Sequence, residues 1–219
     1  MYTKNQNFFR EETPTSAYWA GFIAADGYIK TKDCVAIRLS IKDRAHLEWF
    51  AKNSGYNGKI RVYTECGGFS DKTIVATVTV CGVRQWVDDL AQIYNIVPKK
   101  SLILQPPKIT KAKLVYSYIK GYIDGDGHIE GPLRQYETKN GIKQCPHLRI
   151  KILGTLDVLS WIKRKTQATT QICHRKNKLY VIAINGKIAF RFAKLANKYC
   201  NIGLSRKWDK VAQYQALIG

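Results

Sequence analysis

Two aspartates, Asp26 and Asp126, hold matching positions in a stretch of sequence that occurs twice. Residues 17–27 read Ala-Tyr-Trp-Ala-Gly-Phe-Ile-Ala-Ala-Asp-Gly, and residues 117–127 read Ser-Tyr-Ile-Lys-Gly-Tyr-Ile-Asp-Gly-Asp-Gly. Two carboxylates that a fold brings together repel each other and raise each other's pKa. A hard divalent cation, which favours carboxylate and carbonyl oxygens, relieves that repulsion. The pair therefore predicts a metal site, provided that the two stretches meet.

Small residues recur at every fourth position in both stretches and predict that the stretches do meet. On a helix this spacing forms one stripe without bulk, where a second backbone can approach closely. We expect two helices that pack against each other through Gly21 and Gly121. Each helix is expected to end at Asp-Gly, with Gly27 and Gly127 in the left-handed conformation that often follows a helix. The stripe consists of Ala17, Gly21 and Ala25 in one copy and of Ser117, Gly121 and Gly125 in the other.

The alternative for the same residues is a pair of ordinary core helices whose terminal aspartates face solvent. A carboxylate at a helix C-terminus faces the negative end of the helix dipole, which disfavours it. A purely structural chain has no reason to place one there twice in register. The matched pair therefore favours the metal site.

The two nine-residue segments resemble the two motifs of a single-chain LAGLIDADG homing endonuclease. They read Trp-Ala-Gly-Phe-Ile-Ala-Ala-Asp-Gly at 19–27 and Ile-Lys-Gly-Tyr-Ile-Asp-Gly-Asp-Gly at 119–127. In that family the eighth residue of the motif is the metal-binding acid, which corresponds to Asp26 and Asp126. The sixth residue is often acidic too, and here it is Ala24 in one copy and Asp124 in the other. This difference makes the two halves unlike.

Composition points to a polyanionic partner and to a reducing compartment. The chain of 219 residues carries 36 basic and 16 acidic residues, a formal charge of +20, which favours nucleic acid. Its six cysteines form no CxxC pair, so we expect reduced thiols in an intracellular protein of the cytoplasm or an organelle matrix. No apolar run is long enough for a membrane span, and residues 1–10 lack a signal core.

Periodicity after each motif predicts helix–strand–strand–helix–strand–strand–helix, repeated twice, in an α+β fold. We expect residues 1–105 and 106–219 to form the two halves, residues 1–13 to be a loose lead-in, and Thr15 or Ser16 to cap the first helix. In the second half, Gly127 to Tyr136 read as one strand of a longer first hairpin, and residues 205–217 as an added helix. The predicted counterparts are Arg38 with Arg149, Trp49 with Trp161, Gly82 with Gly186, and Lys100 with Lys207.

Each half should contain an antiparallel sheet with helices on one face and polar side chains on the other. Such an open basic face suits DNA, where arginines read guanine edges and lysines contact phosphates. A single basic residue is as often a solvated surface charge, but the patterned set is not. The candidate DNA-binding residues are Tyr28, Lys30, Lys32, Arg38, Ser40, Lys42, Lys59, Arg61, Tyr63, Thr77, Thr79, His128, Glu130, Arg134, Arg149, Lys151, Gln171 and Arg175.

The resemblance implies an assembly and a reaction. The motif helices would pack at the centre of two pseudo-symmetric halves, and the sheets would form a saddle on double-stranded DNA. Asp26 and Asp126, with the carbonyls of Ala25 and Gly125, would bind Mg²⁺ (or Mn²⁺) over the minor groove, and each strand would be cut once to leave short 3′ overhangs. The basic residue that the family keeps near each scissile phosphate corresponds to Lys100 and Lys207, with Lys42 and Lys151 as weaker candidates. A monomer without a protein partner would suffice.

Two other classes of function stay open. Some proteins of this family act as intron RNA maturases, and the scaffold could also serve a DNA-binding regulator that does not cleave. A regulator has no need of both acids, whereas a maturase role could be added to cleavage. No protein-splicing domain surrounds the repeats, so we expect a free-standing or intron-encoded protein. A basic scaffold of unrelated function is the third alternative.

Overall fold

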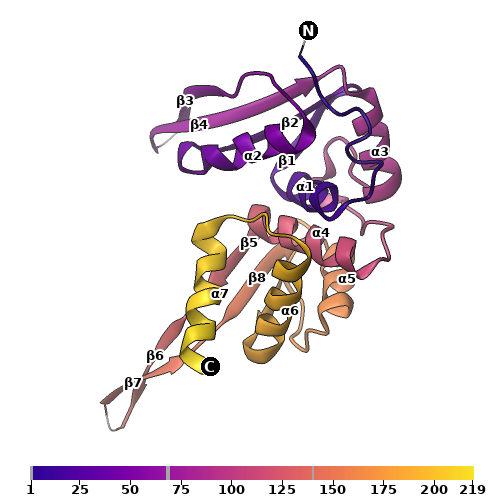
Figure 1. Ribbon diagram of the computed structural model, residues 1–219. Helices are drawn as coiled ribbons and strands as arrows, with labels where there is room; N and C mark the ends of the chain where they lie inside the picture. The colour runs from indigo at the N-terminus through magenta and orange to yellow at the C-terminus, as the bar shows by residue number, and fades with distance from the viewer. Residues whose placement is uncertain (1, 68–69, 140) are drawn as a thin grey trace.

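The computed structural model describes residues 2–67, 70–139 and 141–219, and it contains the predicted repeat. The first half runs α1 (Pro14–Ala25), β1 (Gly27–Thr31), β2 (Cys34–Ser40), η1 (Ile41–Asp43), α2 (Arg44–Ser54), β3 (Arg61–Gly67), β4 (Ser70–Cys81), α3 (Arg84–Tyr94) and η2 (Lys100–Leu102). The second runs α4 (Ala112–Asp126), β5 (Gly127–Glu130), β6 (Leu133–Thr138), β7 (Gly141–Pro146), β8 (Arg149–Gly154), α5 (Leu156–Thr166), β9 (Cys173–Lys176), β10 (Leu179–Asn185), α6 (Gly186–Tyr199) and α7 (Ser205–Ile218). The α+β class is confirmed (Figure 1).

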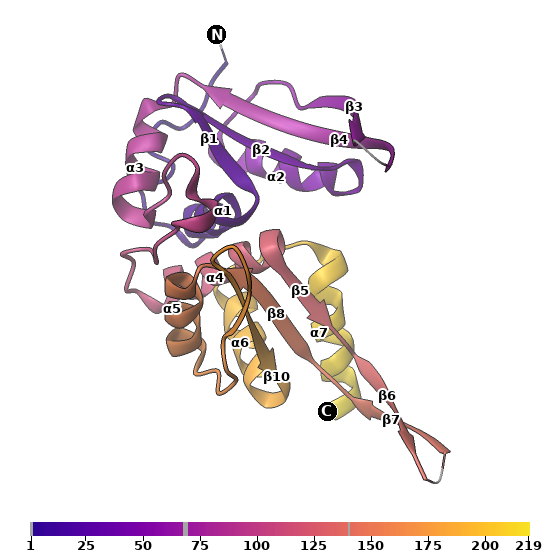
Figure 2. The ribbon, with the colours of Figure 1, turned by 180° about the vertical axis from the view of Figure 1, so that it is seen from behind.

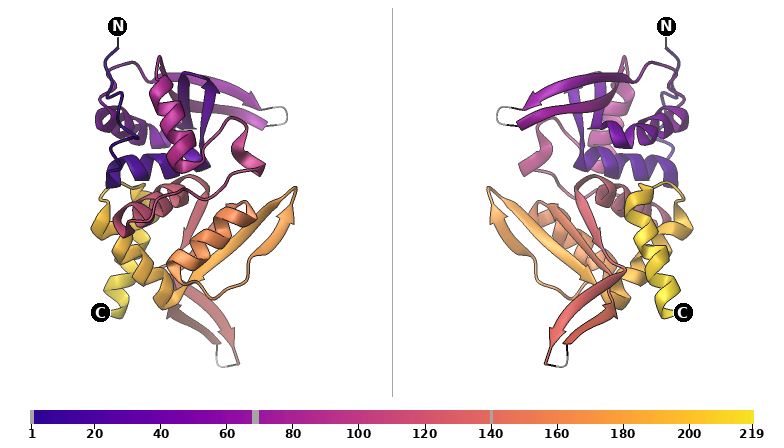
Figure 3. Two further views of the ribbon diagram at one scale, coloured as in Figure 1. Left: turned by 90° about the vertical axis from the view of Figure 1, so that its right-hand side faces the viewer. Right: turned by 90° about the vertical axis from the view of Figure 1, so that its left-hand side faces the viewer.

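Each half contains a four-stranded antiparallel sheet of the same connectivity. The strand orders are β1-β2-β4-β3 and β5-β8-β10-β9. The inner strands place apolar side chains against the helices, as Ile37 and Val78 do in the first sheet and Ile152 and Ile184 do in the second. The other face stays open. Figure 3 shows the two sheets spreading apart from the central pair of helices.

The central helices α1 and α4 pack at backbone contact, as the small-residue stripe predicts (Figure 1). A Cβ atom added to Gly21 would lie 2.0 Å from the carbonyl oxygen of Tyr118. A Cβ atom added to Gly121 would lie 1.9 Å from the carbonyl oxygen of Tyr18. Such distances leave no room for any side chain, so both glycines are required by the interface.

The ends of the central helices differ from the prediction. Thr13, not Thr15 or Ser16, is the N-cap of α1. It forms a capping box with Ser16, in which the side chain of each residue accepts a hydrogen bond from the backbone N–H of the other. Gly27 and Gly127 do not adopt the left-handed conformation, and the φ of Gly127 is −100°. They are glycines for a steric reason, because a Cβ would lie 2.8 Å from the Cα of Ile23 and 2.6 Å from the carbonyl oxygen of Ile123, respectively.

The amino-terminal segment is part of the core, so the prediction of a loose lead-in is wrong. Phe8 and Phe9 are buried, and the Phe9 ring meets the edge of Trp86 at 5.5 Å between centroids. The indole nitrogen of Trp86 donates to the carbonyl of Asn5 over 2.7 Å. These contacts fasten the segment along α3.

The longer hairpin of the second half is a separate two-stranded ribbon, β6–β7, and not an extension of one strand. β5 ends at Glu130, and β6 and β7 pair only with each other, from Leu133 opposite Pro146 to Thr138 opposite Gly141. The ribbon projects away from the rest of the molecule (Figures 1 and 2). The Lys139-Asn140-Gly141 sequence predicts a turn between the two strands, and Asn140 lies outside the described residues.

The strand registers correct one of the predicted counterparts. Gly27 lies opposite Ile37, whereas Gly127 lies opposite Ile152. Ile152 is therefore the counterpart of Ile37, and Arg149 corresponds to Cys34 and not to Arg38. Gly82 and Gly186 do correspond, since each has a positive φ, of 67° and 54°, where a strand passes into a helix.

Trp49 and Trp161 occupy equivalent places in α2 and α5, but only Trp161 is buried.

The cysteines that the structure describes are free thiols. Within the described residues, no helix combines the length and apolar character that crossing a bilayer requires.

Candidate functional site

Asp26 and Asp126 emerge side by side at the ends of the two central helices. Asp26 is the C-cap of α1, and Asp126 is the last residue of α4. The helices are still close together here, since a Cβ on Gly125 would lie 2.4 Å from the Cβ of Ala25 and 3.2 Å from the amide nitrogen of Asp26. Both aspartates reach solvent. The close approach that the sequence predicts thus places the two carboxylates near enough to repel each other.

The pKa values of both carboxyls are raised. Partial desolvation by the surrounding protein raises the pKa of Asp126 to about 6, and repulsion by Asp26 adds to it. Desolvation also raises the pKa of Asp26, while Lys207 and Lys100 lower it. Raised pKa values mean that the charged forms of the two carboxyls are disfavoured, and a cation bound between them would stabilise those charged forms.

Lys100 and Lys207 occupy equivalent places beside the aspartates. The Nζ atom of Lys100 donates to the carbonyl of Gly27 over 2.7 Å, and that of Lys207 donates to the carbonyl of Gly127 over 2.8 Å. Each side chain is only 6% exposed. Desolvation lowers the pKa of both ammonium groups, and nearby aspartates counter the shift: Asp126 and Asp26 for Lys100, Asp124 above all for Lys207. The predicted correspondence of the two lysines holds in three dimensions.

The oxygen atoms around the aspartates fit a hard divalent cation that takes part of its ligands from elsewhere. No group of three or more His, Cys, Asp or Glu side chains in the described part of the chain could hold a metal ion. Two carboxylates with the carbonyls of Ala25 and Gly125 form an oxygen-only donor set of the kind that Mg²⁺ accepts together with water and substrate phosphate. The Gly125 carbonyl also lies 3.4 Å from the Nζ of Lys207, which competes for it.

Most candidate DNA-binding residues lie exposed on the strands, on the adjoining turns or on the β6–β7 ribbon. The exposed ones are Tyr28, Lys30, Lys32, Arg38, Ser40, Lys42, Lys59, Arg61, Tyr63, His128, Arg134, Gln171 and Arg175. Thr79, Glu130, Arg149 and Lys151 are half-buried. Thr77 is buried, and its hydroxyl donates to the Tyr63 hydroxyl over 3.3 Å.

Two of these cations are already paired within the protein. Arg38 forms an ion pair with Glu65, and Lys151 forms one with Glu130. Lys151 lowers the pKa of Glu130. Contact of either cation with a nucleic acid would therefore require an exchange of partners.

Two hollows on the open faces gather residues that the sequence did not connect. One, of about 430 Å³, is lined by Arg149, Lys151, Gln171 and Arg175 together with His174. The other, of about 670 Å³, adds Tyr2 and Lys4 to Lys30, Lys59 and Arg61. His174 stands next to Arg175 in β9, so strict alternation would place it on the other face, and the register shift between β9 and β10 explains why both line the hollow. Tyr2 and Lys4 carried no signal in the sequence either, because only the packed amino-terminal segment brings them there.

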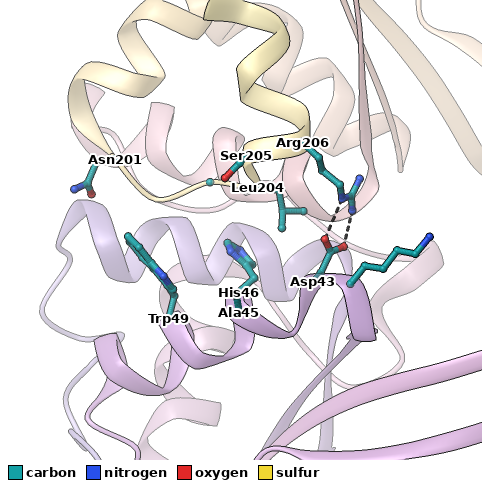
Figure 4. A pocket seen from close by; sticks show the side chains of 10 residues that line it. Asp43, Ala45, His46, Trp49, Asn201, Leu204, Ser205 and Arg206 are labelled. Carbon is teal, nitrogen blue, oxygen red and sulfur yellow. Dashed lines mark hydrogen bonds and ion pairs between the residues drawn. The ribbon is translucent and has the colours of Figure 1, made fainter.

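A further pocket, of about 360 Å³, lies between α2 and the segment that leads into α7 (Figure 4). It is lined by Trp49 and His46 on one side and by Leu204 and Ser205 on the other. Arg206 closes one end by a bidentate ion pair with Asp43, at 3.0 and 2.6 Å. Asp26 and Asp126 are not among its lining residues, so it is distinct from the aspartate pair.

Comparison with solved structures identifies the fold, whereas no protein-family model and no curated protein sequence matches the chain. The homing endonuclease I-WcaI bound to its DNA recognition sequence has a TM-score of 0.59 and 13% identity, over 90% of this chain and 85% of that one. The I-LtrWI LAGLIDADG homing endonuclease bound to target DNA has a TM-score of 0.56 and 13% identity, over 97% and 90%. I-SmaMI bound to an uncleaved DNA target in the presence of calcium ions has a TM-score of 0.51 and 14% identity, over 92% and 91%. The chain therefore has the LAGLIDADG homing endonuclease fold.

Proposed function

We propose that this chain, with its LAGLIDADG homing endonuclease fold, is a site-specific DNA endonuclease that makes a metal-dependent double-strand break. The observation that carries the proposal is the symmetric set at the centre. Asp26 and Asp126 end the two packed helices, and Lys100 and Lys207 each donate to the glycine carbonyl next to an aspartate. The similar structures that contain DNA support the choice of partner.

The open faces of the two sheets bind the duplex. Basic side chains on both sides of the centre contact phosphates, and the arginines and polar residues between them read base edges in the major groove. Because the side chains on the two sheets differ, the target is long and asymmetric. Residues 1–105 bind one half of it and residues 106–219 the other.

At the centre, Asp26 and Asp126 hold Mg²⁺, for which Mn²⁺ substitutes, with the carbonyls of Ala25 and Gly125. The bound ion supplies charge stabilisation for the attacking water and the leaving oxygen of an in-line displacement at phosphorus. Lys100 and Lys207, whose pKa values are lowered by burial, each stand beside one scissile phosphate. There an ammonium group polarises a water molecule or offsets the charge that develops on the phosphate.

One chain per target is sufficient, because the internal repeat already supplies both halves of the interface. Sedimentation of the protein on a cognate duplex should give one chain per duplex, and two chains per duplex would contradict this stoichiometry. A regulator that binds without cleaving is the weaker alternative, since it gains nothing from two adjacent carboxylates with raised pKa values.

The proposal is tested by cleavage of a random pool. A library of duplexes with a randomised central segment is incubated with the protein in Mg²⁺, and the ends of cut molecules are captured and sequenced. Cleavage should enrich one long asymmetric sequence, cut once in each strand with short 3′ overhangs. Enrichment by binding in Ca²⁺ without any cutting in Mg²⁺ or Mn²⁺ would favour the regulator.

A further inference from the structure

The second central helix carries a buried charged pair that the first helix lacks. Lys120 and Asp124 stand four residues apart on α4 and are 2% and 1% exposed. The equivalent positions on α1 are Ala20 and Ala24, which are also buried. Burying charges this deeply is strongly unfavourable unless every one of them is paired or hydrogen-bonded. The chain therefore uses this pair for something that only the second half needs.

Both members of the pair contact the first turn of α7. The carboxylate of Asp124 accepts from the indole nitrogen of Trp208 over 2.8 Å and from the backbone amide of Leu204 over 3.1 Å. The ammonium group of Lys120 lies 4.7 Å from the centre of the Trp208 ring and donates to the carbonyl of Cys200 over 2.8 Å. The carboxylate of Asp124 also accepts a hydrogen bond from the Tyr18 hydroxyl of α1, over 2.6 Å.

Lys207 lies between the two residues that Asp124 holds. Leu204 precedes it by one turn, and Trp208 follows it directly. Its Nζ atom meets the carbonyls of Ile123 at 2.8 Å, Asp124 at 2.6 Å and Gly127 at 2.8 Å. On the solvent side, Arg206 ties the same turn to Asp43 of the first half (Figure 4). The ammonium position of Lys207 is thus set by the docking of one helical turn.

Lys100 is held in another way. It begins the short η2 turn, which leads into the linker between the halves, and among the described residues its Nζ atom has one hydrogen-bond partner, the carbonyl of Gly27. The methyl side chains of Ala20 and Ala24, which replace Lys120 and Asp124 on α1, cannot bind an aromatic ring or a backbone N–H group beside Lys100. The two lysines reach equivalent places on unlike supports.

We propose that Asp124 and Lys120 hold the first turn of α7 in place and thereby fix the position of Lys207. Cleavage of one DNA strand then depends on this buried pair, which has no equivalent in the first half of the chain. This inference rests on the proposed nuclease function. Displacement of a catalytic group by about 1 Å can cost about a hundredfold in rate. Loss of the anchor therefore slows one strand and spares the other, which turns the enzyme into a nicking enzyme.

The test measures each strand separately. A duplex recovered from the random pool is end-labelled on either strand, and single-turnover nicking is followed in Mg²⁺. Asp124→Asn replaces one of the two acceptor oxygens by an amide donor, which then faces either the indole donor of Trp208 or the backbone donor of Leu204. We expect it to slow one strand at least about tenfold and the other less than about twofold. Lys207→Met should slow the same strand, and Lys100→Met the opposite one.

Two controls separate positioning from general damage, and a second variant stands in if the first does not fold. Tyr18→Phe removes a hydrogen bond of Asp124 without touching α7, and it should leave the ratio of the two strand rates unchanged. Asp124→Asn added to Lys207→Met should change that ratio no further, which would not hold if Asp124 acted through the neighbouring Asp126. If Asp124→Asn does not fold, Trp208→Phe, which removes the indole donor together with part of the ring that Lys120 faces, carries the test.

The outcomes are distinguishable. Equal slowing of both strands by the folded Asp124 or Trp208 variant overturns this inference and leaves the nuclease function standing. A further change of the strand ratio in the double variant also overturns it. Absence of cleavage by the unmodified protein on every duplex of the pool overturns the proposed function and this inference with it.

Discussion

Gly121 lies against Tyr18 so closely that a single added methyl group would come within 1.9 Å of the Tyr18 carbonyl oxygen. The reciprocal contact, between Gly21 and the Tyr118 carbonyl oxygen, lies on the other helix of the pair. The obstructing atoms belong to the backbones of α1 and α4, which cannot rotate out of the way. The spacing of the two aspartates follows from this contact, because they end the same two helices.

Gly21→Ala and Gly121→Ala should each destabilise the protein by about 3 kcal/mol, the upper end of overpacking costs, because neither backbone can yield. Gly186→Ala is the matched control, since its φ is 54° and nothing lies within 4 Å of the added atom. It should cost about 1 kcal/mol from backbone conformation alone. Urea unfolding of the three variants decides the matter. Equal costs at all three positions would show that the helices can separate.

The raised pKa of Asp126 predicts a pH-dependent gain on its replacement. Its folded pKa of about 6 exceeds the ordinary 3.8, so the folded state favours the protonated form. The contribution to stability is fully present below about pH 4 and is lost as the pH rises through 6. In metal-free protein, Asp126→Asn should therefore be more stable than the unmodified chain at pH 7, and the difference should shrink towards pH 4.

Thermal unfolding in a chelator at the two pH values measures this effect. Asp209→Asn, which removes an exposed carboxylate of α7 far along the sequence from the motif, serves as the control and should show no comparable pH-dependent difference. A lower melting temperature of Asp126→Asn at pH 7 would contradict the electrostatic account of the aspartate pair.

DNA affinity should fall steeply with salt, because the sheets release counterions from phosphates when they bind. Even about six phosphate contacts cost roughly a thousandfold in affinity between about 50 and 200 mM salt. Lys30→Ala, on the open face of β1, should reduce the slope of log affinity against log salt by about 1. Lys198→Ala, exposed at the end of α6, should leave the slope unchanged. A nearly flat dependence for the unmodified protein would contradict the proposed surface.

The sequence predicted the arrangement that depends on local spacing. The small residues at fourfold spacing and the alternation in the strands are properties of short segments, so the helix pair and the two sheets follow from them. The conformation of Gly27 did not follow, because a close approach to Ile23 and a left-handed turn both demand glycine. Phe8 and Phe9 were missed for another reason: two apolar residues in a polar run show no period, and their burial depends on a distant helix.

The candidate site divides along the same line. The aspartate pair and the match of Lys100 with Lys207 could be predicted, since each lies at a fixed place relative to a motif. The surroundings of Asp124 could not, because its partners Leu204 and Trp208 stand about eighty residues away and only tertiary packing brings them to α4. The register of β8 shows that Arg149 is not the counterpart of Arg38. It could not be predicted either, because it depends on how the inserted β6–β7 ribbon leads into β8.

The central claim is that Asp26 and Asp126 serve one shared metal-dependent site for cleavage, and a pair of conservative variants tests it most directly. Asp26→Asn and Asp126→Asn keep the shape of each side chain and remove the charge that holds a hard cation. Each purified variant is incubated with plasmid carrying the selected target in Mg²⁺, alongside a gel-shift assay on the same target in Ca²⁺. We expect both variants to bind the target and neither to linearise the plasmid, although nicking of a single strand can persist. Normal linearisation by either variant would remove that aspartate from the reaction, and loss of binding together with loss of fold would show that the pair is structural.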